Sequence, residues 1–168
     1  ALYCRKGIRP EILIQGGAQE RGRRGGTENI PGIVGMAAAL QEAVSNLNAD
    51  MVYVTALRER LIEGLSQIPH SRLNGHRELR CPGTVNFCFE GIEGESLLLW
   101  LDAKGVAASS GSACTSGSLD PSHVLLALGL PHEIAHGSLR LSLGADNTEE
   151  EVAHILKVVP EVVEYLRG

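Results

Sequence analysis

The sequence has no long apolar run and no excess of positive charge. It contains no run of about 18 consecutive apolar residues, and no basic stretch, apolar stretch and small-residue cleavage site open it, so neither a membrane-spanning helix nor a signal peptide is indicated. The formal charge of -5 at pH 7 argues against nucleic acid or an anionic membrane as the main partner. We therefore expect a cytoplasmic protein that binds neither.

Cysteine is also scarce. The four cysteines, Cys4, Cys81, Cys88 and Cys114, form no CxxC pair and no closely repeated spacing. A disulfide framework and a preformed zinc knuckle are therefore not indicated, and we expect free thiols.

What is present is enough for one globular core with alternating strands and helices. The chain has 168 residues, of which 43% are hydrophobic. Because it starts at Ala1 inside an expected strand, we interpret it as a piece of a longer protein. Alternation at a period of two predicts strands at 84–89 and 138–144, and we also expect strands at 1–9 and 106–108. Helical spacing and capping signals predict helices over about 31–47, 50–68, 95–104, 120–129 and 147–166. Pro31 suits the first turn of the first helix, Asp120 is placed to cap the fourth, and Thr148 and Glu151 have the spacing of a capping box at the start of the last.

One cysteine stands in a stretch that cannot build a core. Residues 109–118 read SSGSACTSGS, with Cys114 among nine small residues. Ordering such a loop is costly in backbone entropy, so it is a poor way to build stability. The composition therefore favours a nucleophilic thiol that has to move between two places. The alternative is an incidental small residue in a loop.

Three segments carry a family resemblance. SSGSACTSGSLDPSHVL, GGAQERGRRGGTENIPGIVGM and AHGSLRLSLG closely resemble the C-terminal part of the NifS/IscS-type cysteine desulfurases, which belong to the class V aminotransferases. The resemblance runs from Ala1 to the last helix. It implies a pyridoxal-phosphate (PLP) enzyme that converts L-cysteine to L-alanine and keeps the sulfur as a persulfide.

The resemblance also implies roles for single residues. Cys114 matches the family's sulfur-accepting nucleophile and is a candidate transient iron–sulfur ligand. Arg140 matches the arginine that binds the substrate carboxylate, where a guanidinium offers two parallel donors; the alternative is a surface arginine paired with an acid. Thr27 matches the threonine that reaches the PLP phosphate of the other subunit of a homodimer; the alternative is that Thr27 or Asn29 caps a helix.

The implied fold is that of the small C-terminal α/β domain of a fold type I enzyme, with a short, mainly antiparallel sheet covered by helices. Residues 1–30 would be a remnant of the large PLP-binding domain and residues 31–168 the small domain. The family's Schiff-base lysine belongs to the large domain and is not matched by Lys6, Lys104 or Lys157, so this chain alone is predicted to be inactive. The implied sulfur acceptor is an iron–sulfur scaffold protein.

Two other functions stay open. One is a persulfide carrier without PLP chemistry of its own. The other is a zinc hydrolase, because HEIAH at 132–136 has the HExxH pattern of two histidines one helical turn apart and a glutamate. That segment lies between Pro131 and Gly137, which leaves barely more than one turn, and it needs a third ligand from His154 or residues 149–151.

Overall fold

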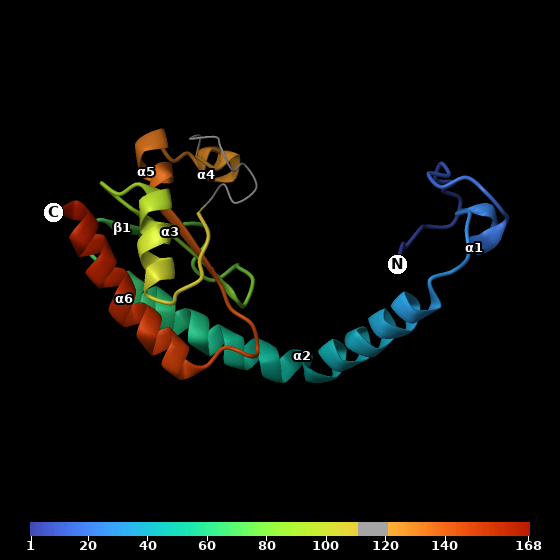
Figure 1. Ribbon diagram of the computed structural model, residues 1–168, viewed down its shortest axis with the longest axis horizontal. Coiled ribbons are helices and arrows are strands. Elements are labelled where there is room, and N and C mark those ends of the chain that lie inside the picture. Colours follow the sequence, from blue (N-terminus) through green and yellow to red (C-terminus); the bar gives the residue numbers. More distant parts are fainter. Residues whose placement is uncertain (111–120) are drawn as a thin grey trace. The chain divides into compact units, whose positions relative to one another are not determined.

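The computed structural model describes residues 1–110 and 121–168 (Figure 1). The chain divides into two compact units, Ala1–Asn46 and Leu47–Gly168. Whether residues 1–30 belong to a larger domain stays a prediction, because compactness within this chain does not test it.

The longest element is helix α2, Ile30–Leu65. It begins as the sequence indicates: Pro31 lies in the first turn, and the Asn29 side-chain oxygen accepts a hydrogen bond from the Gly32 N–H at 3.1 Å. The predicted division into two helices near residue 50 is wrong. Residues 46–50 contain neither glycine nor proline, so nothing in the backbone interrupts the helix there.

The second unit is built on a three-stranded antiparallel sheet of order β1–β2–β3. Strand β1 is Ser71–Leu73, β2 is Thr84–Phe89 and β3 is Ser138–Ser142. The sequence predicted β2 and β3 but not β1, since three residues are too few to show an alternation. The small α/β fold with a short antiparallel sheet is confirmed.

One face of the sheet carries the core. Helix α3 (Gly94–Ala103), helix α6 (Glu149–Arg167) and the C-terminal half of α2 pack against this face. The largest fully buried side chains there are Leu61, Ile62, Leu65, Val85, Phe87, Phe89, Leu97, Leu101, Leu139, Val152, Val159 and Val163. Burial of this size is the main term that holds the unit together.

The opposite face is polar and carries two short helices at one end. By alternation, it presents Thr84, Asn86 and Cys88 of β2 and Ser138, Arg140 and Ser142 of β3. Helices α4 (His123–Ala127) and α5 (His132–His136) and the segment between them cover Cys88 with Leu125, Ala135 and Leu130. Helix α4 is shorter than predicted, with Ser122 at its N-cap position; Asp120, the predicted cap, lies outside the described residues.

The predicted start of the last helix is confirmed in detail. The Glu151 N–H donates to the Thr148 hydroxyl at 3.2 Å, and the Thr148 N–H donates to the Glu151 carboxylate at 3.0 Å. This reciprocal pair is the capping box that the sequence indicates. The carboxylate also accepts from Asn147, and these hydrogen bonds hold the pKa of Glu151 below its ordinary value.

Two predicted strands are wrong. Residues 1–9 form none, because the described residues offer them no partner strand and an unpartnered strand leaves its N–H and C=O groups without hydrogen bonds. Residues 106–108 form none either. Pairing there is limited to one bridge, between Ser109 and Arg140.

Gly137 marks the tightest approach between the α5–β3 corner and strand β2. A Cβ at this position would lie 2.2 Å from the carbonyl oxygen of Phe89 and 3.0 Å from that of Ile92. We expect Gly137→Ala to lower the free energy of unfolding by about 1–3 kcal/mol, because backbone must move to admit the methyl group. Urea denaturation of the intact protein measures this. Gly144→Ala is the matched control, since no heavy atom lies within 4 Å of its added Cβ; equal effects of the two substitutions would contradict the expectation.

Candidate functional site

Arg140 lies in the middle of β3 and is held by backbone hydrogen bonds on its outer edge. The Ser109 N–H donates to the Arg140 carbonyl at 3.1 Å, and the Arg140 N–H donates to the Ser109 carbonyl at 2.6 Å. Ser109 therefore extends the sheet by one residue beside β3. The position of the arginine backbone is fixed on both sides, since β2 pairs with β3 on the inner edge.

The side chain of Arg140 is exposed on the polar face of the sheet. Among the described residues, no carboxylate lies within ion-pair distance of its guanidinium. The alternative of a surface arginine paired with an acid therefore gains no support from the described part of the chain. A planar fork of N–H donors that no described carboxylate pairs with is suited to a carboxylate ligand.

The segment that contains Cys114 is attached to the same part of the fold. Residues 111–120 lie outside the described residues, so the structure does not place this cysteine. On the N-terminal side of the segment, Ser109 pairs with Arg140, and a Cβ added at Gly94 would lie 3.6 Å from the Cβ of Ser110. On its C-terminal side, Pro121 and Ser122 are buried. Both attachment points thus belong to the unit that carries Arg140.

The start of α3, next to Ser110, is held by an ionised carboxylate. The Glu93 side chain accepts hydrogen bonds from the N–H groups of Glu95 at 2.9 Å and Ser96 at 2.7 Å. Partial burial raises the pKa of this carboxyl, but the two N–H groups and the nearby His136 outweigh it, so the net pKa lies below the ordinary value. Glu93 is therefore charged at neutral pH and stabilises the helix N-terminus.

The three described cysteines, Cys4, Cys81 and Cys88, are free thiols, as predicted. Cys88 is completely buried. Burial raises the pKa of its thiol, and the hydrogen bond from Asn74 and the charge of Arg72 offset this only in part. Cys88 therefore stays protonated and inaccessible, which makes it a poor nucleophile.

Thr27 belongs to the first unit. Its side chain is exposed, and its carbonyl accepts a hydrogen bond from the Arg24 guanidinium at 3.1 Å. Asn29, and not Thr27, caps α2. Of the two capping alternatives, the structure therefore selects Asn29, and the Thr27 hydroxyl is not used as the cap.

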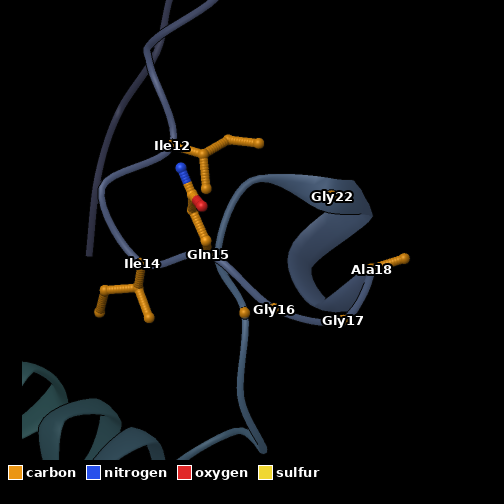
Figure 2. Close-up of a pocket in the computed structure, with 8 residues that line it drawn as sticks. Ile12, Ile14, Gln15, Gly16, Gly17, Ala18 and Gly22 are labelled. Atoms are coloured by element: carbon orange, nitrogen blue, oxygen red, sulfur yellow. The ribbon is translucent and has the colours of Figure 1, made fainter.

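The loop before Thr27 folds tightly on itself. A Cβ at Gly25 would lie 2.7 Å from the Cα of Gly16, so only glycine permits this approach. The loop and the short helix α1 (Gln19–Gly22) frame a hollow of about 410 Å³, lined by Ile12, Ile14, Gln15, Gly16, Gly17, Ala18, Gly22 and Gly25 (Figure 2). The glycines that line this hollow allow a ligand to approach the backbone closely.

The residues around Thr27 fit the phosphate end of PLP. An exposed hydroxyl and a neighbouring guanidinium suit an anion, and Arg21 and Arg23 add positive potential. The described chain offers no matching lysine: Lys6, Lys104 and Lys157 are all exposed, in a loop, at the end of α3 and on α6. That the covalent lysine belongs to another part of the family fold stays a prediction from the resemblance.

The HEIAH segment forms the five-residue helix α5. His132 is exposed and His136 is half-buried. In residues 1–110 and 121–168, no three His, Cys, Asp or Glu side chains gather as a metal site would require. The zinc alternative therefore gains no support from the described residues.

Among the helices that the structure describes, none combines the length and the apolar character needed to span a bilayer.

Comparison with known proteins identifies the family. The profile of the aminotransferase class-V family matches residues 13–155, and the chain belongs to this family. A cysteine desulfurase IscS from Methanosarcina thermophila is 59% identical over 168 residues, which are 100% of this chain and 42% of that protein. The chain thus spans about two fifths of the length of this relative.

Solved structures agree with this assignment. A protein described as NifS-like is 37% identical, with a TM-score of 0.85 over 97% of this chain and 41% of its own. The NifS-like protein of Rickettsia africae is 26% identical, with a TM-score of 0.83 over 94% of this chain and 41% of its own. The resemblance to the NifS/IscS-type proteins that the sequence motifs indicated is confirmed.

One neighbour of Arg140 on the sheet is not singled out by any sequence motif. Asn86 is the residue of β2 directly opposite Arg140, and Asn74 donates a hydrogen bond to its side chain. The only sequence signal was the place of Asn86 on the polar side of the alternating segment 84–89.

Proposed function

We propose that the full-length protein is a PLP-dependent cysteine desulfurase, which releases L-alanine from L-cysteine and takes the sulfur as a persulfide on Cys114. One observation carries the proposal: Arg140, exposed and without a carboxylate partner in the described chain, is hydrogen-bonded through its backbone to Ser109, which leads into the Cys114 segment. The family assignment and the names of the relatives support the same function.

The roles of the chain's own residues follow from their chemistry. Arg140 binds the substrate carboxylate through two parallel N–H donors. The Cys114 thiolate attacks the substrate sulfur; the S–S bond forms as the carbon–sulfur bond breaks, the electron pair of that bond stays on the carbon skeleton, and a proton completes L-alanine. PLP, when bound, supplies an electron-withdrawing group next to the substrate α-carbon.

The proposal extends to assembly and partners. Thr27, with Arg24 beside it, holds the cofactor phosphate of the other subunit, so the working form is a homodimer. The persulfide passes to an acceptor such as an iron–sulfur scaffold protein, and in that transfer Cys114 serves as a transient iron–sulfur ligand. We place the enzyme in the cytoplasm.

The test uses the full-length protein loaded with PLP. We expect L-alanine and, with a reductant, sulfide in equal amounts from L-cysteine, and a mass increase of about 32 Da on the peptide that contains Cys114 before reduction. Alanine without the adduct would exclude Cys114 as the sulfur acceptor. An adduct that forms only from a persulfide donor, without alanine from L-cysteine, would favour the persulfide carrier. If a chelator abolished turnover by the full-length protein and added zinc restored it, the result would favour the hydrolase.

A further inference from the structure

Asn86 and Arg140 form a cross-strand pair on the polar face of the sheet. They are direct partners in the register of β2 and β3. The N–H and C=O of Arg140 both bond to Ser109, on the side away from β2, so Asn86 and Arg140 form a pair without backbone hydrogen bonds between them. Such pairs bring the Cα atoms to about 4.5 Å and the side chains closest together.

The amide of Asn86 is held in one orientation by a buried neighbour. The Asn74 Nδ2 donates to the Asn86 Oδ1 at 2.6 Å, and the Asn74 N–H donates to the Asn86 carbonyl at 2.9 Å. Asn74 itself is only 7% exposed, and its carbonyl accepts from the Arg80 guanidinium at 3.0 Å. Because the Asn86 oxygen is engaged, the group it has left to offer is its NH₂, on the face that carries Arg140.

The buried Asn74 side chain is not explained by its contribution to stability alone. The Asn74 Oδ1 is buried and has no hydrogen-bond partner among the described residues. An unpaired buried amide oxygen costs free energy that an apolar side chain of similar size would not. A functional reason for keeping an amide at position 74 is therefore favoured. Its Nδ2 donates to Asn86 and to the Cys88 Sγ; Cys88 is completely buried, so Asn86 is the one of the two that can meet a ligand.

We propose that Asn86 donates a hydrogen bond from its amide to the substrate carboxylate that Arg140 binds, and that Asn74 is a positioning residue for it. This inference rests on the proposed function. A carboxylate has about four lone-pair sites, and the fork of Arg140 engages two of them, which leaves room for a neutral donor at its side. The pair selects amino-acid thiols over thiols that have no carboxylate.

The experiment compares L-cysteine with cysteamine, which is L-cysteine without its carboxyl group, on the PLP-loaded full-length enzyme. We expect Asn86→Ala to raise the KM for L-cysteine about tenfold to a hundredfold, the size of one hydrogen bond to a charged group, with the cofactor absorption spectrum unchanged. The inhibition constant of cysteamine is expected to stay within about twofold, since no carboxylate contact is lost. Asn86→Asp is expected to raise the KM further, because it presents a carboxylate to a carboxylate.

Thr84→Ala is the matched control, because Thr84 lies on the same face of β2, opposite Ser142, and is exposed. It should change neither constant. A KM for L-cysteine within about twofold of wild type in Asn86→Ala would overturn the inference. Equal weakening of L-cysteine and cysteamine would overturn it too, since that result indicates a general disturbance of the pocket.

The positioning role of Asn74 has its own test. Asn74→Ala should raise the KM for L-cysteine in the same direction, and the double substitution with Asn86→Ala should add little to either single one, because both act on the same hydrogen bond. Additive effects of the two substitutions on the KM would overturn the positioning role of Asn74 but not the proposed role of Asn86. If the wild-type enzyme does not turn over L-cysteine at all, the proposed function has failed. If the wild-type enzyme does turn it over, but the Asn86 variants have the wild-type KM, this inference alone has failed.

Discussion

Replacing Cys114 with serine in the full-length protein is expected to lower alanine formation from L-cysteine on the order of a thousandfold or more. A thiol with an ordinary pKa is a few per cent ionised at neutral pH and is intrinsically nucleophilic, whereas a serine hydroxyl is neither. The variant should still bind PLP and L-cysteine, because the proposal assigns the cofactor phosphate to Thr27 and the substrate carboxylate to Arg140. The readouts are alanine, sulfide and the mass of the peptide that contains residue 114.

Cys81→Ser provides the matched control. Cys81 is exposed, as a sulfur acceptor has to be, but it lies in the segment between β1 and β2 and not in the small-residue loop. Its substitution should leave alanine formation and the adduct on Cys114 unchanged. Full activity of Cys114→Ser, or an adduct of the same size on Cys81 in the wild-type enzyme, would contradict the assignment of the nucleophile.

The elements that sequence predicted well are those whose signals are local. Strands β2 and β3 alternate over five or six residues, and helix α6 begins with Thr148 and Glu151 at the spacing of a capping box. The failures concern contacts with distant segments. Residues 1–9 have the composition of a strand but no partner in the described chain, and β1 has a partner but only three residues.

The same division applies to the site. Cys114, Arg140 and Thr27 were selected by motifs, which need no knowledge of the fold. The pairing of Asn86 with Arg140 depends on which strands are neighbours and in which register, and a shift of one residue would bring Phe87 or Val85 opposite the arginine. Asn74 follows a strand that the sequence did not reveal, so its hydrogen bond to Asn86 was beyond the reach of pattern analysis.

A second large effect is expected at Arg140. Arg140→Ala should lower kcat/KM for L-cysteine on the order of a hundredfold or more, mainly through KM, because two charge-assisted hydrogen bonds to the carboxylate are lost. Arg140→Lys should recover only part of this, since an ammonium group keeps the charge but not the planar fork. Steady-state kinetics of the PLP-loaded full-length enzyme measure both variants.

Arg72→Ala separates loss of the carboxylate contact from loss of positive charge. Arg72 is an exposed arginine on β1, paired in register with Cys88, so its side chain lies on the same face of the sheet as Arg140 but two strands away. Exposed charges at such a distance are weakened by solvent and salt, and the KM for L-cysteine should change less than about twofold. If Arg72→Ala raised the KM as much as Arg140→Ala, the arginines would act through the general positive field of the face. A large effect confined to position 140, and smaller for lysine than for alanine there, requires direct two-point contact with the substrate.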